Sequence, residues 1–149
     1  MRGPYRKRMI LQPPQVKNFK PSGIPRRMLE SITLHVDEYE AIRLADHLGL
    51  EHQEAAERMH ISRPTFTRLI ERARHKVATA LVEGKELIIE GGNVDFLHNL
   101  NYCKECGETF PAEEESERCP DCGSENVENL NQQFLNFERG RRGHGRRGR

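Results

Sequence analysis

The chain has 149 residues, of which 35% are hydrophobic and 32% are charged, and its formal net charge at pH 7 is +1. These proportions predict a small core with long solvated flanks. A membrane-spanning protein is excluded as well, because no apolar run in the sequence approaches the ~20 residues that a spanning helix needs.

Basic and acidic residues are separated along the chain. Residues 1–27 carry eight Lys or Arg and no acid, and residues 139–149 carry six Arg and no acid. Residues 103–138, in contrast, carry ten acids. This asymmetry indicates a polyanionic partner for the two basic ends.

Residues 1–30 are predicted to form an extended basic arm, because five prolines interrupt any helix there. The first basic residues of this arm could insert into a DNA minor groove, or they could form a non-specific solubilising tail. The sequence leaves both interpretations open. The residues concerned are Arg2, Arg6, Lys7 and Arg8.

The segment after the arm is predicted to contain a short strand and then a helix. Apolar and polar residues alternate from Ser31 to Val36, which is typical of a strand. Asp37 is suited to cap a helix, and Glu40 completes a pattern similar to a capping box. A helix is therefore expected over residues 38–48.

Two more helices are expected, over residues 52–59 and from Ser62 to Gly84. Ser62 caps the second of these, and Pro64 falls in its first turn, where a missing N–H costs little. A further strand is predicted at Leu87–Ile89, and its pairing with residues 32–36 is left open. The long helix carries one apolar stripe: Phe66, Leu69, Ile70, Ala73, Val77, Ala80 and Leu81.

The two helices and their three-residue turn have the pattern of a helix-turn-helix. Ala56 is small where the helices cross, and apolar residues fall at the buried positions of the motif. The opposite face is basic, and arginine is well shaped for a bidentate bond to guanine. An ordinary solvated face is the alternative. The candidate DNA contacts are Gln53, Arg63, Pro64, Thr65, Thr67, Arg68, Arg72 and Lys76.

Four cysteines follow in the spacing C-x2-C-x12-C-x2-C: Cys103, Cys106, Cys119 and Cys122. A segment of fewer than about 40 residues rarely folds without a metal or disulfides. The N-terminus lacks a secretory signal, so a reducing cytoplasm is expected and a closed four-thiolate zinc site is favoured over two disulfides. Iron in a rubredoxin-like site is the other metal considered. His98 is interpreted as a polar linker residue.

The first 92 residues resemble an uncharacterised prokaryotic family of predicted DNA-binding proteins. Its members carry a helix-turn-helix similar to region 4 of sigma factors, which implies base contacts at Arg63, Pro64, Thr67 and Arg68. One departure is His60, which stands where such turns usually have glycine. The matching stretches are Asp37–Asp46, Glu54–Met59, Ile61–Arg63 and Ala73–Val77.

The sequence therefore predicts a mainly α protein: a small helix-turn-helix domain, a small zinc ribbon with four cysteine ligands, and disordered basic termini. The expected role is sequence-specific binding of double-stranded DNA in transcription regulation, in the cytoplasm at the nucleoid. No catalytic arrangement is recognisable, so an enzyme is not expected. The predicted segments are the arm 1–30, the DNA-binding domain 31–92, a linker 93–101, the ribbon 102–130 and an Arg/Gly-rich tail 131–149.

Two other functions stay open. The first is an RNA-binding or ribosome-associated module that uses the ribbon and the Arg/Gly tail. The second is an adapter whose acidic ribbon contacts RNA polymerase or another protein of the transcription or translation machinery. A homodimer is the default expectation for regulators that read two half-sites.

Overall fold

The computed structural model describes residues 7–112, 118–132 and 134. Of these residues, 39% are helical and 21% lie in strands, and the strands form three small sheets. The fold is therefore mixed α and β, and the expectation of a mainly α protein is wrong. Every strand in the described residues has only two to four residues, which is too short for the alternation of side chains to reveal most of them in the sequence.

One sheet joins the arm to both ends of the helical region. Strand β3 (Ser31–Leu34) pairs in parallel with β4 (Glu86–Ile89), and β2 (Asn18–Phe19) pairs antiparallel with the other edge of β4. The pairing between the predicted strands at 31–36 and 87–89 is thereby confirmed, as Ile32 lies opposite Leu87. The arm also forms a short 3-10 turn, η1 (Arg26–Met28), before β3.

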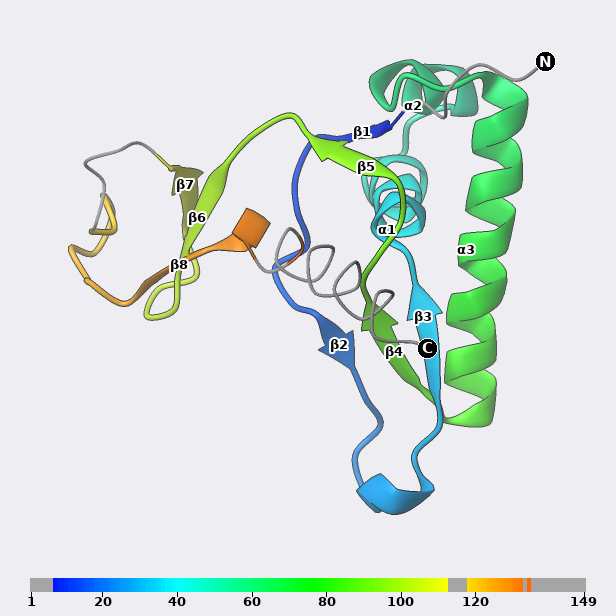
Figure 1. The fold of residues 1–149 in the computed structure, drawn as a ribbon, viewed down its shortest axis with the longest axis horizontal. Coiled ribbons are helices and arrows are strands. Elements are labelled where there is room, and N and C mark those ends of the chain that lie inside the picture. Colours follow the sequence, from blue (N-terminus) through cyan, green and yellow to red (C-terminus); the bar gives the residue numbers. More distant parts are fainter. Residues whose placement is uncertain (1–6, 113–117, 133, 135–149) are drawn as a thin grey trace, which may run out of the picture.

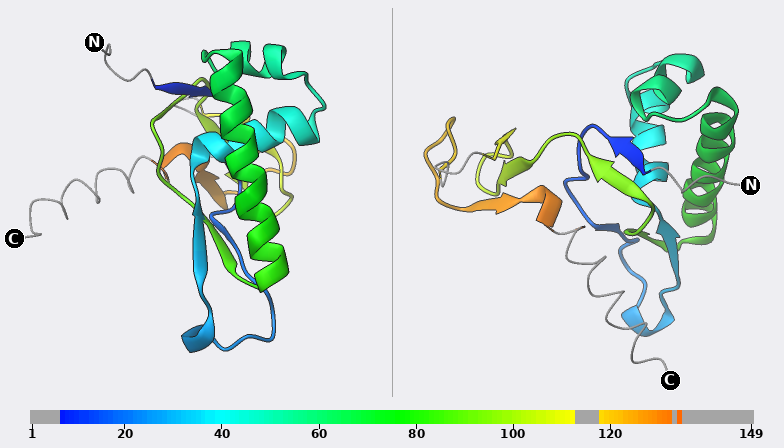
Figure 2. Two further views of the ribbon diagram at one scale, coloured as in Figure 1. Left: turned by 90° about the vertical axis from the view of Figure 1, so that its right-hand side faces the viewer. Right: turned by 45° about the horizontal axis from the view of Figure 1, so that its top comes forward.

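The longer helices all lie between β3 and β4 in the chain. They are α1 (Val36–Ile42), its π-helical continuation η2 (Arg43–His47), α2 (His52–Arg58) and α3 (Arg63–Glu83). Helix α3 runs alongside β3 and β4 over much of its length (Figures 1 and 2). It ends at Gly84, whose φ of 66° is left-handed, as expected for a glycine that terminates a helix. Within the described part of the chain, no helix has the length and hydropathy needed to span a bilayer.

Two details of these helices correct the sequence interpretation. Helix α1 is capped by His35, not by Asp37, and the carboxylate of Glu38 accepts the His35 backbone N–H at 2.8 Å. Leu81 belongs to the predicted apolar stripe of α3 but is 78% exposed. It lies at the edge of that stripe, in the last turn of the helix.

The remaining strands form two sheets, one that includes the start of the arm and one in the cysteine-bearing segment. Strand β1 (Arg8–Ile10) pairs in parallel with β5 (Val94–Phe96), so part of the expected linker 93–101 belongs to a sheet. The third sheet has the order β7-β6-β8, all antiparallel, from β6 (Leu100–Cys103), β7 (Thr109–Pro111) and β8 (Val127–Asn129). This ribbon sheet projects away from α3 (Figure 1).

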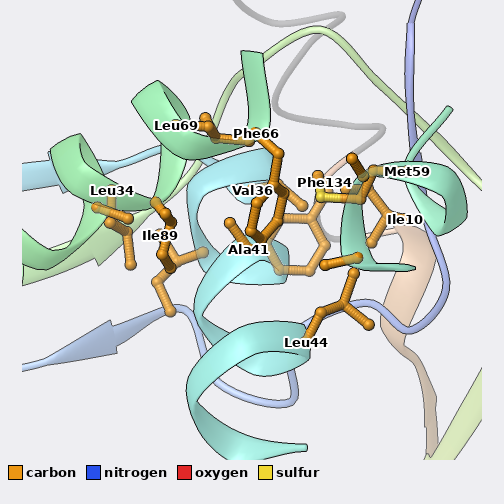
Figure 3. Packing of buried hydrophobic residues seen from close by; sticks show 14 residues of the cluster. Ile10, Leu34, Val36, Ala41, Leu44, Met59, Phe66, Leu69, Ile89 and Phe134 are labelled. Atoms are coloured by element: carbon orange, nitrogen blue, oxygen red, sulfur yellow. The ribbon is translucent and has the colours of Figure 1, made fainter. Parts of the chain in front are cut away.

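The core lies between α3, α1, α2 and the strands that flank them. Phe66, Leu69 and Ile70 of α3 are fully buried there, in one cluster with Leu34 of β3 and Ile89 of β4. Two members come from far away in the sequence: Ile10 of the arm and Phe134, which follows the ribbon (Figure 3). Ile10 and Phe134 are thus packed into the same core as the helices.

Candidate nucleic-acid interface and metal centre

The turn between α2 and α3 is fixed by a left-handed residue, a backbone hydrogen bond and a side-chain cap. His60 has a φ of 58°, so a histidine occupies the left-handed conformation that favours glycine, as its place in the predicted turn indicates. The next residue, Ile61, donates its backbone N–H to the carbonyl of Ala56 at 3.0 Å. Ser62 then caps α3, and its Oγ accepts the Thr65 N–H at 3.3 Å. These contacts set where α3 begins.

The first turns of α3 present exposed cations. Arg63 and Arg68 are exposed, and neither has a hydrogen-bond or ion-pair partner among the described residues. Thr67 lies between them in the chain, and its hydroxyl is 3.1 Å from Nδ1 of His52 on α2. Two guanidinium groups are therefore left available at the end of α3 that adjoins the turn.

The other candidate contacts at the start of these helices are Thr65, Gln53 and Pro64. The side chains of Thr65 and Gln53 already form hydrogen bonds within the protein. Thr65 Oγ1 accepts a hydrogen bond from Ser62 Oγ at 2.8 Å. Gln53 on α2 donates to Glu57 one turn later at 3.1 Å, and both side chains are exposed. Pro64 is exposed in the first turn of α3.

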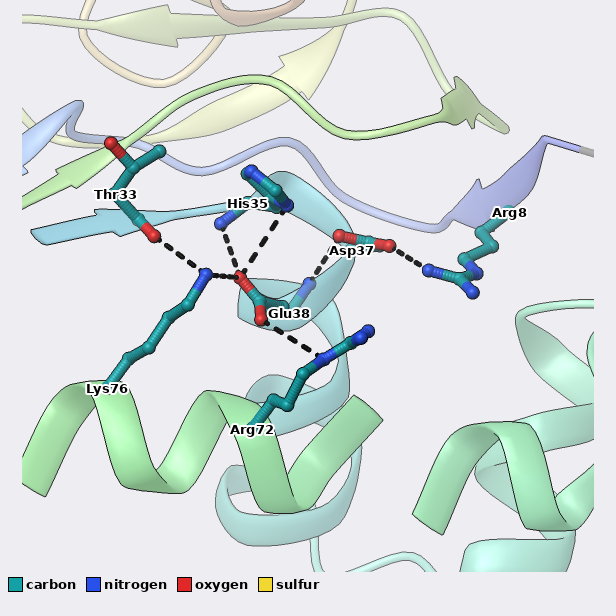
Figure 4. Close-up of polar contacts among 7 residues, drawn as sticks. All are labelled: Arg8, Thr33, His35, Asp37, Glu38, Arg72 and Lys76. Carbon is teal, nitrogen blue, oxygen red and sulfur yellow. Dashed lines mark hydrogen bonds and ion pairs between the residues drawn. The ribbon is translucent and has the colours of Figure 1, made fainter. Parts of the chain in front are cut away.

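Arg72 and Lys76 point toward a buried carboxylate. Glu38 of α1 is 2% exposed and accepts a hydrogen bond from Lys76 Nζ at 2.6 Å. The same ammonium group donates to the backbone oxygen of Thr33 at 2.9 Å, and Arg72 Nε lies 3.8 Å from the other Glu38 oxygen (Figure 4). Lys76 thus holds α3 against β3 and α1.

A second pair neutralises another cation of α3. The Arg74 guanidinium donates two hydrogen bonds to Asp46, at 2.7 and 3.1 Å. This hydrogen bonding lowers the pKa of the Asp46 carboxyl and raises the pKa of Arg74. The charge of Arg74 is therefore matched within the protein.

The sequence interpretation missed three buried acids at the start of α1. Asp37, Glu38 and Glu40 are each at most 3% exposed. Asp37 pairs with Arg8 of β1, whereas Glu40 pairs with Arg43 at 2.6 Å and accepts the Leu11 backbone N–H at 2.6 Å. The sequence signal for these buried acids was their close spacing among apolar residues. Capping of α1 explains only some of the acids in this segment.

The four cysteines come together in the ribbon. Their sulfur atoms all lie within 4.8 Å of one another, and two pairs, Cys103 with Cys122 and Cys106 with Cys119, are 3.6 Å apart. A zinc–sulfur bond of about 2.3 Å gives sulfur–sulfur edges of roughly 3.8 Å in a tetrahedron. The sulfur atoms therefore fit a closed four-thiolate metal site, and all four cysteines are free of disulfides.

The two cysteine turns have matching backbone geometry. The N–H of Gly107 donates to the Cys103 carbonyl, and that of Gly123 donates to the Cys119 carbonyl, both at 2.9 Å. Both glycines have positive φ, 82° and 76°, as their positions after the C-x2-C pairs predict. Each turn thus presents two sulfur atoms toward the same point.

Two of the crowded thiols, those of Cys103 and Cys106, have pKa values shifted in opposite directions. Hydrogen bonding by the Cys106 backbone N–H lowers the pKa of the Cys103 thiol to about 7. At Cys106 the backbone N–H of Glu108 acts in the same direction, but desolvation and the neighbouring thiols outweigh it and raise the pKa to about 12. A bound divalent metal would remove this conflict by stabilising all four thiolates.

Comparison with known proteins identifies the family. Residues 1–97 match the family described as "Protein of unknown function DUF134". The chain is 56% identical to a UPF0251 protein of Chloroherpeton thalassium over 140 residues, 93% of each chain. It is also 47% identical to a UPF0251 protein of Moorella thermoacetica over 115 residues, which are 76% of this chain and 77% of the relative. No solved structure matches significantly.

Proposed function

The chain belongs to the DUF134 family of prokaryotic proteins, and we propose that it binds double-stranded DNA sequence-specifically through the start of α3 and regulates transcription. The observation that carries this proposal is the pair Arg63 and Arg68. They are exposed and unpartnered among the described residues, on a helix whose start is fixed by a helix-turn-helix turn. Arginine in such a place suits a bidentate bond to guanine in the major groove.

Charge matching elsewhere on α3 strengthens the argument. On an ordinary solvated helix, paired and unpaired cations would show no regular distribution along the helix. Here Lys76 and Arg74 have acidic partners, Arg72 lies near one, and the unpaired arginines are those in the first two turns. Lys76 and Arg72 accordingly support the position of α3 and take a smaller part in reading bases.

Strand β1 of the arm lies beside the turn between α2 and α3. The backbone N–H of Met9 donates to the carbonyl of Met59, at the end of α2, at 3.1 Å. Strand β1 fixes this position through its pairing with β5. Residues 1–6, including Arg2 and Arg6, lie outside the described residues, but their attachment point supports an added phosphate or minor-groove contact by the arm.

We infer that the metal of the ribbon is zinc and that it is structural. Four thiolates fill a tetrahedral site and leave no position for a substrate. The metal would supply the stability that this small sheet lacks in apolar contacts, since its buried cluster contains only Cys103, Cys119 and Phe110 among the described residues.

Selection from a random duplex pool at physiological salt tests the DNA-reading proposal. The full-length, zinc-loaded chain is expected to enrich one motif, and Arg68→Ala should weaken binding to it by about 1–3 kcal/mol. Arg74→Ala is the matched control, because it removes an exposed cation of the same helix that Asp46 already neutralises. An unenriched pool, or equal losses in both variants, would leave only phosphate attraction and contradict sequence-specific reading.

A further inference from the structure

A hollow of about 680 Å³ lies where the arm, the α1–η2 helix and the ribbon meet. This volume falls within the range of ~300–1,000 Å³ that is usual for small-molecule sites, and junctions between modules often hold such sites. Its apolar walls come from all three parts. They are formed mainly by Pro13, Val16, Phe19, Ile42, Leu48, Leu100 and Leu130.

Several of these apolar side chains are unusually exposed. Val16, Phe19 and Leu48 are 47%, 57% and 48% exposed, although each lines the same hollow. Contiguous exposed apolar surface in a soluble protein commonly marks a binding site. These side chains would gain by covering the apolar body of a ligand.

A π-helical turn forms one wall of the hollow. The backbone N–H of Leu48 donates to the carbonyl of Arg43, five residues earlier, at 2.9 Å. This wider turn brings Arg43, His47 and Leu48 to the lining. Such π turns inside α-helices are rare and occur frequently at functional sites.

The polar groups of the lining include hydrogen-bond donors that can reach an anion. Arg43 and His47 line the hollow, and none of the described residues that line it is acidic. Buried Glu40 accepts hydrogen bonds from Nε and Nη2 of Arg43, at 2.6 and 3.2 Å. This pair matches the charge of Arg43 and holds its guanidinium in place, and it leaves Nη1 as a donor without a partner among the described residues. Tyr39 and two glutamines add further hydrogen-bonding groups.

We propose that this hollow binds a small aromatic carboxylate, with its ring against Phe19 and Leu48 and its carboxylate toward Arg43 and His47. The size of the hollow, its exposed apolar lining and the absence of acids among its described lining residues all fit a flat apolar body with one negative charge. This inference is independent of the proposed DNA binding, because none of the lining residues that the structure describes belongs to α3.

Calorimetric titration of the full-length, zinc-loaded protein tests the site. The probes are naphthalene-2-carboxylate and its neutral isostere naphthalene-2-carboxamide, and the carboxylate should bind about tenfold or more tightly. Leu48→Glu places a like charge in the lining and should weaken carboxylate binding at least about tenfold. Leu81→Glu is the matched control, because Leu81 is 78% exposed and lies outside the hollow.

His47→Gln separates the charge from the apolar contribution. This variant should lower the ratio of carboxylate affinity to carboxamide affinity. The affinity for the carboxamide itself should stay nearly unchanged. Three results would overturn the proposal: no saturable binding up to about 1 mM, equal affinities for the two probes, or equal effects of Leu48→Glu and Leu81→Glu.

Discussion

Glu38 shows how one buried carboxylate fixes the position of a helix that carries exposed cations. It is 2% exposed and accepts hydrogen bonds from Lys76 on α3 and from the backbone of His35 at the start of α1. A cation of α3 is thereby engaged inside the protein. The result is a fixed position of α3 relative to β3.

Replacing Glu38 by alanine should destabilise the protein by about 2–3 kcal/mol, because Lys76 and the backbone N–H of the N-cap residue His35 would lose a charged acceptor. Urea denaturation followed by far-ultraviolet circular dichroism measures this change. Glu54→Ala is the control: its pair with Arg58 is exposed on both sides and contributes about 0.5 kcal/mol or less. Equal midpoints for the two variants would refute the role given to Glu38.

Single residues with a local cause were predictable from the sequence. The left-handed φ of His60 agrees with its place in the predicted turn, where glycine is usual, and the Ser62 cap follows from its hydroxyl before a proline-containing first turn. The pairs Glu38 with Lys76 and Asp46 with Arg74 were not predictable. Each joins residues 28 or 38 positions apart, and only the packing of α1 and η2 on α3 brings them together.

At the level of elements, the helices were predictable and most of the strands were not. Helix α3 has a long apolar period and clear ends, so its limits follow from local chemistry. Strands β1, β2 and β5 have two or three residues each and exist because of partners far away in the sequence. A proline-rich arm can be predicted to be extended, but the sequence does not tell which strand it joins.

The metal proposed for the four cysteines should stabilise the ribbon and not the helical domain. Removing zinc with a chelator should unfold β6, β7 and β8, since about 10–16 kcal/mol of binding free energy is lost, and should preserve α3. Hydrogen exchange should show lost protection at Gly107 and Gly123, with continued protection of the Leu69 and Ile70 amides.

Variants at single residues give the matched comparison for metal removal. Cys106→Ser should reproduce the effect of the chelator, and His98→Ala should retain one zinc per chain in native mass spectrometry. Loss of zinc from His98→Ala, or loss of helical circular dichroism on chelation, would contradict this separation of the two modules.

At the scale of the whole molecule, the core extends beyond the part that defines the family. The family match ends at residue 97, yet Phe134 is buried to 6% exposure in the same cluster as Phe66 and Met59. Its ring lies 6.0 Å from that of Phe96, centroid to centroid. The chain therefore returns from the ribbon to the helical domain. Tail residues 133 and 135–149 and the acidic loop 113–117 lie outside the described residues.

This return predicts that a residue after the ribbon stabilises the helical domain. Phe134→Ala removes a large side chain from a packed core, which costs about 3 kcal/mol, and the helical signal should accordingly melt at lower urea concentration. Gln132→Ala is the control, because Gln132 is exposed two residues earlier and should change stability by no more than about 0.5 kcal/mol. If Phe134→Ala unfolds at the same urea concentration as the unmodified chain, the helical domain is stable without the segment that follows the ribbon. If it unfolds earlier, a residue that follows the ribbon in the chain contributes to the stability of the helical core.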